Sequence, residues 1–494
     1  MGVFFAHFYI KVLKITKTKI VKFSKKLVQN WLCENDDIVY REIPSKTKSI
    51  WIVYVNSMTD KKLLSQTIVE PLLSVKNFEY SSISSTLPCP EIAKILNKQK
   101  FVSSLLAGSA LVFEDNGNFA ISLSVAGFST RSISEPPTSQ VTKGPREGFV
   151  EDLNTNLSMI RRRLKTPNLA VKKIVVGRQS QTNVCVVFLK NIADKKLVKI
   201  LQDKISKIDI DGVIDSYYIE TFLEEGKLKF LRRIGNSEKP DVIASRLLEG
   251  RVAIVVDGSP IVLTLPFLLI EDLQSPEDYY QISARTTFLR LIRLVGLILG
   301  VLLPGIYVAL QSYQYRVLPI VFLVTLLSNI EGISLPPLLE ILFVLFLFDI
   351  LAEASARMPK LLGMALSIIG ALVLGETTVQ AGIISPPSIV VVAISSIMLF
   401  IIPDDVPQVS LLRILFTVVG GVAGFYGMLM SFIMASTYLI SADGYGVPLL
   451  SPYAPTNKHD KQDAIIKKPL LKLTKRPSVF QTKNSTRLGR KHDE

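Results

Sequence analysis

The sequence predicts a two-part protein: an α/β N-terminal soluble region of two subdomains, followed by an all-α polytopic membrane domain. The chain has 494 residues, is 48% hydrophobic and has a mean hydropathy of +0.36, which is high for a soluble protein of this length. Its first half alternates short β-branched runs with amphipathic stretches. At Phe288 the composition changes to long apolar windows without charge.

Residues 1–35 are predicted to form a basic amphipathic arm. Seven lysines precede the first acidic residue, Glu34, and are interleaved with phenylalanine, leucine and isoleucine. Such a segment suits an anionic membrane surface, and a disordered lysine-rich tail explains the composition equally well. A secretory signal would need a longer unbroken apolar core and a small-residue cleavage site.

Residues 36–131 are predicted to form the first α/β subdomain. Ile50 to Val55 is a β-branched run typical of a strand, and Thr59-Asp60 is an expected N-cap for an amphipathic helix that ends near Val75. The run Asp115-Asn116-Gly117-Asn118 separates two apolar stretches and predicts a β-hairpin.

Residues 132–143 are rich in Ser, Thr and Pro and are interpreted as a linker to a second α/β subdomain, residues 144–287. A helix is expected over residues 147–164, because its acidic start and basic end complement a helix dipole. The remaining strands and helices of this subdomain are expected at residues 171–176, 184–189, 194–208, 215–225 and 252–256.

Residues 288–440 are predicted to form a transmembrane helical domain of four to six spans. The first span lies in a 22-residue uncharged window that follows Arg293, which is long enough to cross a bilayer. Four spans result if residues 318–351 are re-entrant. In the six-span arrangement the starting points are near Leu294, Val317, Leu338, Leu361, Ile389 and Leu415.

The distribution of charge places the N- and C-termini in the cytoplasm. The chain is basic beside Arg290 and Arg293, and residues 441–494 form a basic cytoplasmic tail with eleven Lys or Arg against four acids from Thr456 onward. The positive-inside rule then requires an even number of spans. The net charge of +15 indicates an anionic lipid membrane rather than nucleic acid as partner.

The sequence indicates no enzyme active site. The three cysteines are far apart and form no CxxC pair, and the three histidines lie near the termini. No phosphate-binding, dinucleotide-binding or zinc-protease motif occurs. We therefore expect no enzyme activity, no cofactor and no metal.

Two strings near the start of the apolar region carry a specific resemblance. They read Gly-Arg-Val-Ala-Ile-Val-Val-Asp-Gly-Ser-Pro over residues 250–260 and Gln-Ser-Pro-Glu-Asp-Tyr-Tyr over residues 274–280. The sequence here resembles the GerA family, the A subunits of bacterial spore germinant receptors. Four further stretches agree in the family's order, at residues 144–169, 208–216, 363–386 and 446–455.

The resemblance implies a receptor subunit in the spore inner membrane whose partners are a permease-like B subunit that binds nutrient and a lipoprotein C subunit. It further implies a homo-oligomer that acts as a nutrient-gated cation channel. A scaffold or signal-coupling subunit without a pore is the alternative. A secondary transporter would need paired repeats in the membrane domain, and the sequence shows no convincing repeat.

Ionisable residues inside apolar segments are costly and are therefore candidates for an ion pathway, since carboxylates along a wet path attract cations. Glu340 and Asp349 are expected on opposite sides of one straight helix because they are nine residues apart. The resemblance suggests that Glu376 and Gln380 are exchanged relative to the family's usual order, and a buried hydrogen bond is the alternative role for Glu376. The four candidates are Glu340, Asp349, Glu376 and Gln380.

One ion pair and one set of contact residues are expected besides these candidates. Glu353 precedes Arg357 by four residues, which predicts an ordinary helix-end ion pair. The string before the first span is a candidate for coupling or subunit contact, with helix capping and interfacial anchoring as the simpler interpretation. The coupling and interface candidates are Arg146, Glu147, Gln274, Glu277, Asp278, Tyr279 and Tyr280.

Overall fold

The computed structural model of the chain divides into two compact units. We name them the α/β unit (residues 1–226, 234–267 and 474–494) and the helical unit (residues 227–233 and 268–473). Most of the predicted arm, most of the predicted linker and most of the span expected near Leu361 lie outside the described residues. The structure describes residues 22–32, 35–44, 49–74, 78–89, 91–127, 143–224, 232–359, 363, 368, 370, 372, 375–401 and 406–488.

The first subdomain of the α/β unit contains a five-stranded antiparallel sheet of strand order β1-β2-β4-β5-β3. The hairpin predicted at residues 115–118 is confirmed between β4 and β5, and Asp60 caps the predicted helix at its start. The strands are β1 (Ile38–Ile43), β2 (Ile50–Val55), β3 (Ile92–Ile95), β4 (Ser109–Glu114) and β5 (Ala120–Ser124). The helices are α2 (Lys25–Trp31), α3 (Lys61–Leu64), α4 (Glu70–Ser74), α5 (Tyr80–Thr86) and α6 (Lys98–Leu106), with a π-helical turn at Ser65–Val69 between α3 and α4.

Strand β2 shows why this sheet is covered on both faces. Its side chains alternate between two apolar clusters: Trp51 and Val53 pack with Phe101, whereas Ile50 and Ile52 pack with Ile68. Successive residues of a strand point to opposite faces. The near-continuous apolar sequence of β2 therefore fits a strand that is buried on both sides.

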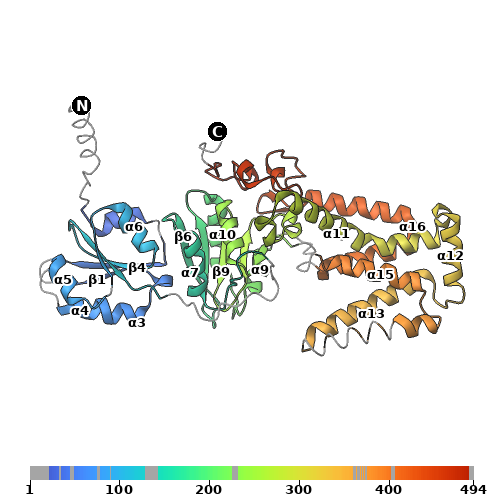
Figure 1. The fold of residues 1–494 in the computed structure, drawn as a ribbon, viewed down its shortest axis with the longest axis horizontal. Helices are drawn as coiled ribbons and strands as arrows, with labels where there is room; N and C mark the ends of the chain where they lie inside the picture. Colours follow the sequence, from blue (N-terminus) through green and yellow to red (C-terminus); the bar gives the residue numbers. More distant parts are fainter. Residues whose placement is uncertain are drawn as a thin grey trace, which may run out of the picture. The chain divides into compact units, whose positions relative to one another are not determined.

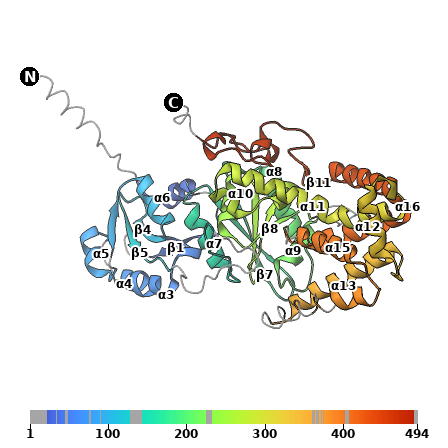
Figure 2. The ribbon, with the colours of Figure 1, turned by 45° about the vertical axis from the view of Figure 1, so that its right-hand side comes forward.

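The second subdomain repeats the topology of the first. Its sheet has the strand order β6-β7-β9-β10-β8, which is the same order when the strands are counted from β6, and it is also antiparallel. Figures 1 and 2 show its strands between α7 and α9. The elements are β6 (Leu169–Val176), β7 (Thr182–Leu189), β8 (Gly235–Ser237), β9 (Val252–Val256), β10 (Val262–Leu265), α7 (Leu153–Arg163), α8 (Lys195–Ser206), α9 (Ser216–Leu223) and α10 (Pro240–Leu248).

Helix α7 begins six residues later than the sequence predicts, at Leu153 instead of residue 147. The side chain of Asp152 accepts a hydrogen bond from the backbone N–H of Thr155 at 2.7 Å and so caps the helix there. The side-chain amide of Asn156 accepts a hydrogen bond from the backbone N–H of Val150 and donates one to its carbonyl, which keeps the preceding backbone extended. These local bonds outweigh the favourable charge order that suggested the earlier start.

A buried ion pair joins α7 to the first subdomain. The guanidinium of Arg161 donates to Asp37 at 2.7 Å, and both side chains are almost fully buried. The hydroxyl of Ser57 donates to the same carboxylate at 2.7 Å. Separating the two would leave a buried charge without its partner, so this contact stabilises the attachment of α7 to the first subdomain.

The helical unit begins with two 3-10 turns and continues with five helices among the described residues. Two helical stretches are long and apolar enough to cross a membrane, Ser283–Ser312 and Gln408–Ser441, and α15 is a shorter apolar helix. The first of these starts before the composition change at Phe288. The elements are η3 (Leu269–Leu273), η4 (Pro276–Tyr280), α11 (Ser283–Ser312), η5 (Tyr315–Val317), α12 (Ile320–Ile330), α13 (Pro337–Arg357), α15 (Pro386–Leu399) and α16 (Val406–Ser441).

Helix α16 is a hairpin of two arms rather than one straight span. Gly424 interrupts it with φ 63° and ψ −157°, a conformation that glycine adopts readily. A Cβ added at Gly305 of α11 would lie within 3.0 Å of both Phe416 and Met428, which are twelve residues apart and would be about 18 Å apart along a straight helix. The two arms, residues 406–423 and 425–441, therefore both run along α11.

The kink in α16 is stabilised by α11. The hydroxyl of Tyr313 donates to the carbonyls of Gly421 and Val422 at 3.0 and 2.9 Å. A kink frees backbone carbonyls from the helical ladder, and in an apolar environment these need another partner. The single final span expected to start near Leu415 thus becomes two arms, because Gly424 bends the helix and the Tyr313 hydroxyl binds the carbonyls that the bend frees.

The predicted basic tail is folded along residues 441–488. Residues up to 473 belong to the helical unit and include a two-stranded ladder of β11 (Asp443–Gly444) and β12 (Val447–Pro448). Residues 474–488 belong to the α/β unit, where the backbone N–H of Lys483 donates to the carbonyl of Ile192 at 3.0 Å. The basic composition of this segment therefore does not indicate a freely solvated chain.

Candidate functional site

The string at residues 274–280 forms the turn η4 directly before α11. The backbone N–H of Ser275 donates to the Asp278 carboxylate at 3.2 Å, the arrangement of a capping box. The capping interpretation of this string is thereby confirmed. The carboxylate has further partners that the sequence did not indicate.

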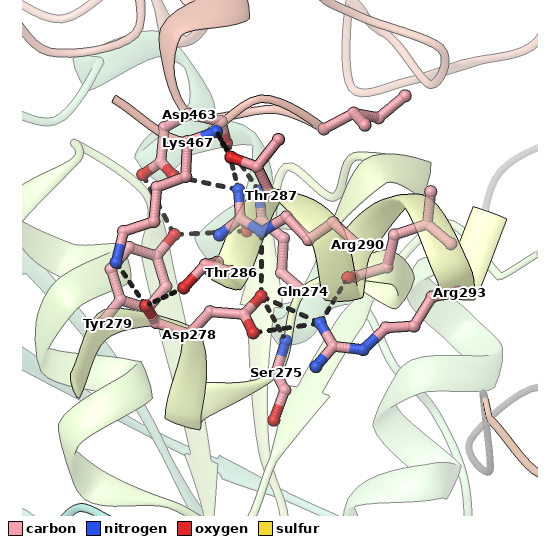
Figure 3. Close-up of polar contacts among 12 residues, drawn as sticks. Gln274, Ser275, Asp278, Tyr279, Thr286, Thr287, Arg290, Arg293, Asp463 and Lys467 are labelled. Atoms are coloured by element: carbon pink, nitrogen blue, oxygen red, sulfur yellow. Dashed lines mark hydrogen bonds and ion pairs between the residues drawn. The ribbon is translucent and has the colours of Figure 1, made fainter. Parts of the chain in front are cut away.

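Asp278 is the shared acceptor of two arginines of α11. Arg290 Nε donates to its Oδ2 at 2.8 Å, and Arg293 Nη1 donates to the same oxygen at 2.9 Å (Figure 3). The side chains of Asp278 and Arg290 are 1% and 0% exposed. Because an α-helix has 3.6 residues per turn, positions 290 and 293 lie on one face of α11, and both side chains can donate to one carboxylate.

A segment far along the sequence completes the cluster. Asp463 Oδ1 accepts from Arg290 Nη1 at 3.1 Å, and Asp463 Oδ2 accepts from the Tyr279 hydroxyl at 3.1 Å. The Gln274 side chain donates to the Asp463 carbonyl at 2.8 Å, and Arg290 also donates to the carbonyl of Ala464. Turn η4, the start of α11 and the segment after α16 therefore meet at one point.

Lys467 adds a third cation. Its ammonium donates to the Asp278 carbonyl and lies 5.0 Å from the centre of the Tyr279 ring, while its backbone N–H donates to the hydroxyl of Thr287 at 3.1 Å. Burial lowers the pKa of the Lys467 ammonium, and the nearby Asp463 carboxylate opposes that shift. We name Asp278, Tyr279, Arg290, Arg293, Asp463 and Lys467 the junction cluster.

The junction cluster contains two of the predicted coupling candidates, Asp278 and Tyr279, and a third, Gln274, donates to the carbonyl of its member Asp463. Glu277 instead accepts from Gln281 at 3.4 Å, and the Tyr280 side chain is 44% exposed. The sequence did not assign Asp463 or Lys467 to a site. A basic segment with one or two acids has no periodicity that reveals a buried contact, so only the fold could identify them.

The candidates Arg146 and Glu147 lie in the α/β unit. Glu147 accepts from Arg163 at 2.6 Å and lies 3.7 Å from Arg162, whereas Arg146 is exposed. These pairs tie the residues before α7 to its basic end. A contact between subunits at Arg146 stays a prediction.

Glu340 lies at the start of α13 and is fully buried. Its Oε1 accepts from both the backbone N–H and the hydroxyl of Ser385 at 2.6 Å. Ser385 is the N-cap of α15, so this carboxylate lies at the positive end of a helix dipole. Within the described residues Glu340 is buried and accepts both bonds inside the subunit, which is the arrangement of a side chain that caps a helix.

Asp349 is paired with Arg413, a cation that the sequence did not indicate as its partner. Arg413 Nη2 in the first arm of α16 donates to Asp349 at 2.8 Å; the arginine side chain is 2% exposed and the aspartate 40%. The Ser410 hydroxyl donates to the same carboxylate at 3.1 Å. Glu340 contacts α15 and Asp349 contacts α16. That the two lie on opposite sides of one helix stays a prediction.

Glu376 and Gln380 are both exposed, and the Gln380 amide donates to Glu376 at 3.3 Å. The predicted pair of Glu353 and Arg357 is confirmed with a nitrogen–oxygen distance of 2.5 Å, and both side chains are mostly exposed. The four pathway candidates therefore occupy three separate environments and do not form one site within a single chain. Across the part of the chain that is described, no group of three His, Cys, Asp or Glu could hold a metal ion.

Comparison with known proteins gives a consistent result along most of the chain. The family model described as "Bacillus/Clostridium GerA spore germination protein" matches residues 26–479. The chain is 34% identical over 466 residues to "Spore germination protein KA" of Bacillus subtilis (strain 168), covering 92% of this chain and 86% of that protein. It is 30% identical over 471 residues to "Spore germination protein GerLA" of Bacillus cereus, covering 93% and 96%.

Among solved structures, the chain is similar to the crystal structure of the N-terminal domain of the A subunit of the Bacillus megaterium spore germinant receptor GerK3. The sequence identity is 26%, with 50% of this chain and 96% of that chain covered, and the TM-score is 0.36.

Proposed function

The chain belongs to the GerA family of spore germination proteins, and from this membership we propose that it is the A-type membrane subunit of a spore germinant receptor. It has two apolar stretches long enough to cross a membrane. We place it in the spore inner membrane as a multi-pass protein with both termini in the cytoplasm. Its partners are a permease-like B subunit and a lipoprotein C subunit, and it assembles with further copies of itself.

The observation that carries the proposal is the junction cluster. It joins the turn before the first candidate span, the start of that span and the segment that follows the last helix, through charges that are largely buried. A displacement of any one segment would leave a buried charge uncompensated, which costs several kcal/mol, typically ~3–5. Such a cluster is suited to hold one arrangement of the three segments and to release it only when a partner supplies comparable energy.

The test replaces one carboxylate of the cluster in spores that carry the variant chain. Asp463→Asn removes the charge opposite Arg290 but keeps an acceptor oxygen, so we expect the chain to be present at normal levels and nutrient-triggered germination to slow several-fold. Asp443→Asn is the matched control, because this carboxylate is exposed in the same C-terminal segment. Normal germination of the Asp463 variant at normal protein levels would contradict the proposal.

On the finer question of how the signal leaves the subunit, we propose a cation path formed by several copies. Asp349 is 40% exposed and Glu376 is exposed beside Gln380, so these carboxylates can face water when chains associate. Glu340 supports the packing of α13 and α15 and takes no part in the path. The alternative is a scaffold that couples signals without conducting.

The two alternatives differ in the effect of a neutral residue at position 376. If the path exists, Glu376→Gln slows cation release from germinating spores while the protein level and its melting temperature stay unchanged. Glu353→Gln is the control, because it also neutralises an exposed carboxylate of the helical unit. Equal release in the wild type and both variants would favour the scaffold.

A further inference from the structure

A cavity of about 310 Å³ lies inside the helical unit between α11 and both arms of α16. Its walls come from residues 294–302 of α11, 408–416 of the first arm and 432–439 of the second arm. The volume is within the range of small-molecule sites, roughly 300–1,000 Å³. It exists because Gly424 turns α16 back on itself and leaves a space that a single straight helix would not enclose.

The lining of the cavity is almost entirely apolar. Ile298 and Phe432 in its wall are 43% and 46% exposed, so the cavity reaches the surface of the bundle. A buried water needs two to four polar partners, typically about three, and the apolar wall does not offer them. An empty cavity would cost its lining the dispersion contacts of a packed interior. The chemistry of the wall therefore suits an apolar occupant better than water.

The position of the cavity identifies the class of that occupant. Both helices that line it contain stretches long and apolar enough to cross a bilayer. In the membrane placement proposed above, the medium around its mouth is lipid acyl chain. The wall on α11 extends over nine residues, which is eight rises of ~1.5 Å or about 12 Å, and this suits an elongated chain better than a compact molecule.

The cavity has a charged end near the start of α11. Arg232 and Asp272 form an ion pair in its wall, with side chains that are 13% and 6% exposed. The carbonyl of the neighbouring Leu273 accepts from Arg293 at 3.0 Å, which places this end beside the first turns of α11. One cation and one anion side by side match a headgroup that carries a phosphate and an ammonium.

We propose that this cavity binds one acyl chain of a zwitterionic membrane phospholipid, with the headgroup beside Arg232 and Asp272. The bound lipid lies next to backbone that also binds the arginines of the junction cluster. Leu273 and Ile465 line the cavity, and the carbonyls of Leu273 and Ala464 accept from Arg293 and Arg290. A bound acyl chain therefore supports the backbone that holds the cluster. The site goes beyond the receptor function, because the lipid is neither the nutrient nor the permeating ion.

The test uses the full chain in nanodiscs of phosphatidylcholine that contain a small fraction of phosphatidylcholine with a diazirine at the end of one acyl chain. After illumination, adducts are located by peptide mass spectrometry. We expect them to concentrate on cavity residues such as Leu297, Leu412 and Phe416, several-fold above the level on exposed residues such as Tyr426. An even distribution over the exposed apolar residues would overturn the proposal.

A matched pair of variants tests the same point independently. Ala435→Phe fills the cavity, whereas Met434→Phe adds similar bulk to a neighbouring residue of the second arm that is 73% exposed and does not line the cavity. Cavity adducts should fall several-fold only in the Ala435 variant, and equal labelling of both would contradict the site. If the Ala435 variant does not fold, the wild-type adduct map decides.

Two further outcomes would also overturn the proposal. Labelling of the cavity by a phosphatidylglycerol probe as strong as that by phosphatidylcholine would remove the role of the zwitterionic headgroup. Cross-links from cavity residues to another polypeptide, with no lipid adduct, would show that a protein segment fills the space.

Discussion

The junction cluster and the acidic residues of the helical bundle show two ways in which an apolar environment accommodates charge. In the junction cluster three cations and two carboxylates share partners across three segments, and Arg290 and Asp278 are almost fully buried. In the bundle each carboxylate stands apart: Glu340 caps a helix, Asp349 meets one arginine, and Glu376 is exposed. The difference indicates that the first set holds segments together, whereas the exposed members of the second set can take part in the cation path proposed above.

The largest effect is expected from Asp278→Ala. The substitution removes the shared acceptor of Arg290 and Arg293 and leaves Arg290 buried, so the helical unit should lose about 3–5 kcal/mol of stability. The measurement is thermal unfolding of the full chain in nanodiscs. Glu277→Ala, one residue away, should change stability by less than about 0.5 kcal/mol. Similar losses in both variants would erase the distinction between the junction cluster and its surroundings.

A smaller effect is expected at Glu340. Glu340→Ala leaves the two donors of Ser385 buried without their acceptor, at a cost of about 1–3 kcal/mol. Glu340→Gln keeps a carbonyl oxygen for the same donors and should cost less. A Gln variant with unchanged unfolding but reduced cation release would show that this carboxylate belongs to the path, contrary to its assignment as a cap.

The loss of stability on replacing Asp349 should depend on whether Arg413 is present. Asp349→Asn leaves the buried arginine without its counter-ion and should cost about 1–2 kcal/mol, less than for a fully buried pair because Asp349 is 40% exposed. The double variant Asp349→Asn/Arg413→Met removes both charges and should recover part of that loss. Additive losses in unfolding experiments would mean that the two side chains do not interact.

The sequence predicted the elements whose local signals are strong and missed those that depend on the fold. The hairpin at residues 115–118 and the N-cap at Asp60 follow from local chemistry and are confirmed. The repeated strand order of the two subdomains was not visible, because strands such as β3 and β8 have three or four residues and no clear alternation. The strings at residues 250–260 and 274–280 identified the family although no single property of the residues shows its function.

The candidate site likewise contains residues that the sequence indicated and residues that only the fold reveals. Asp278 was named from its string, but its partner in the C-terminal segment, Lys467, lies 189 residues away, and no periodicity connects the two. Arg413 was missed because it directly precedes an apolar window. The bend of α16 depends on one conformation of Gly424, which composition does not reveal. Long-range partners and backbone bends are set by tertiary packing, so they follow only from the structure.

The smallest effect concerns pH and the junction cluster. Burial lowers the pKa of Lys467 below its unfolded value of 10.5. As the pH rises through the folded pKa toward 10.5, the folded chain releases this proton before the unfolded chain does, so the free energy of unfolding should rise slightly over that window. Lys467→Met should abolish the rise, as measured by melting temperatures between pH 8 and 10.5. A wild-type melting temperature that falls in parallel with that of the variant would contradict this sign.

We propose that the junction cluster passes the signal as one unit, and a double-mutant cycle in spores tests this claim most directly. Tyr279→Phe and Asp463→Asn each remove one side of the contact between the Tyr279 hydroxyl and Asp463 Oδ2. The measured quantity is the rate of nutrient-triggered cation release at equal protein levels. We predict that each variant slows release and that the double variant is no slower than the slower single one. Release at the wild-type rate in all three variants, or strictly additive effects, would contradict the claim.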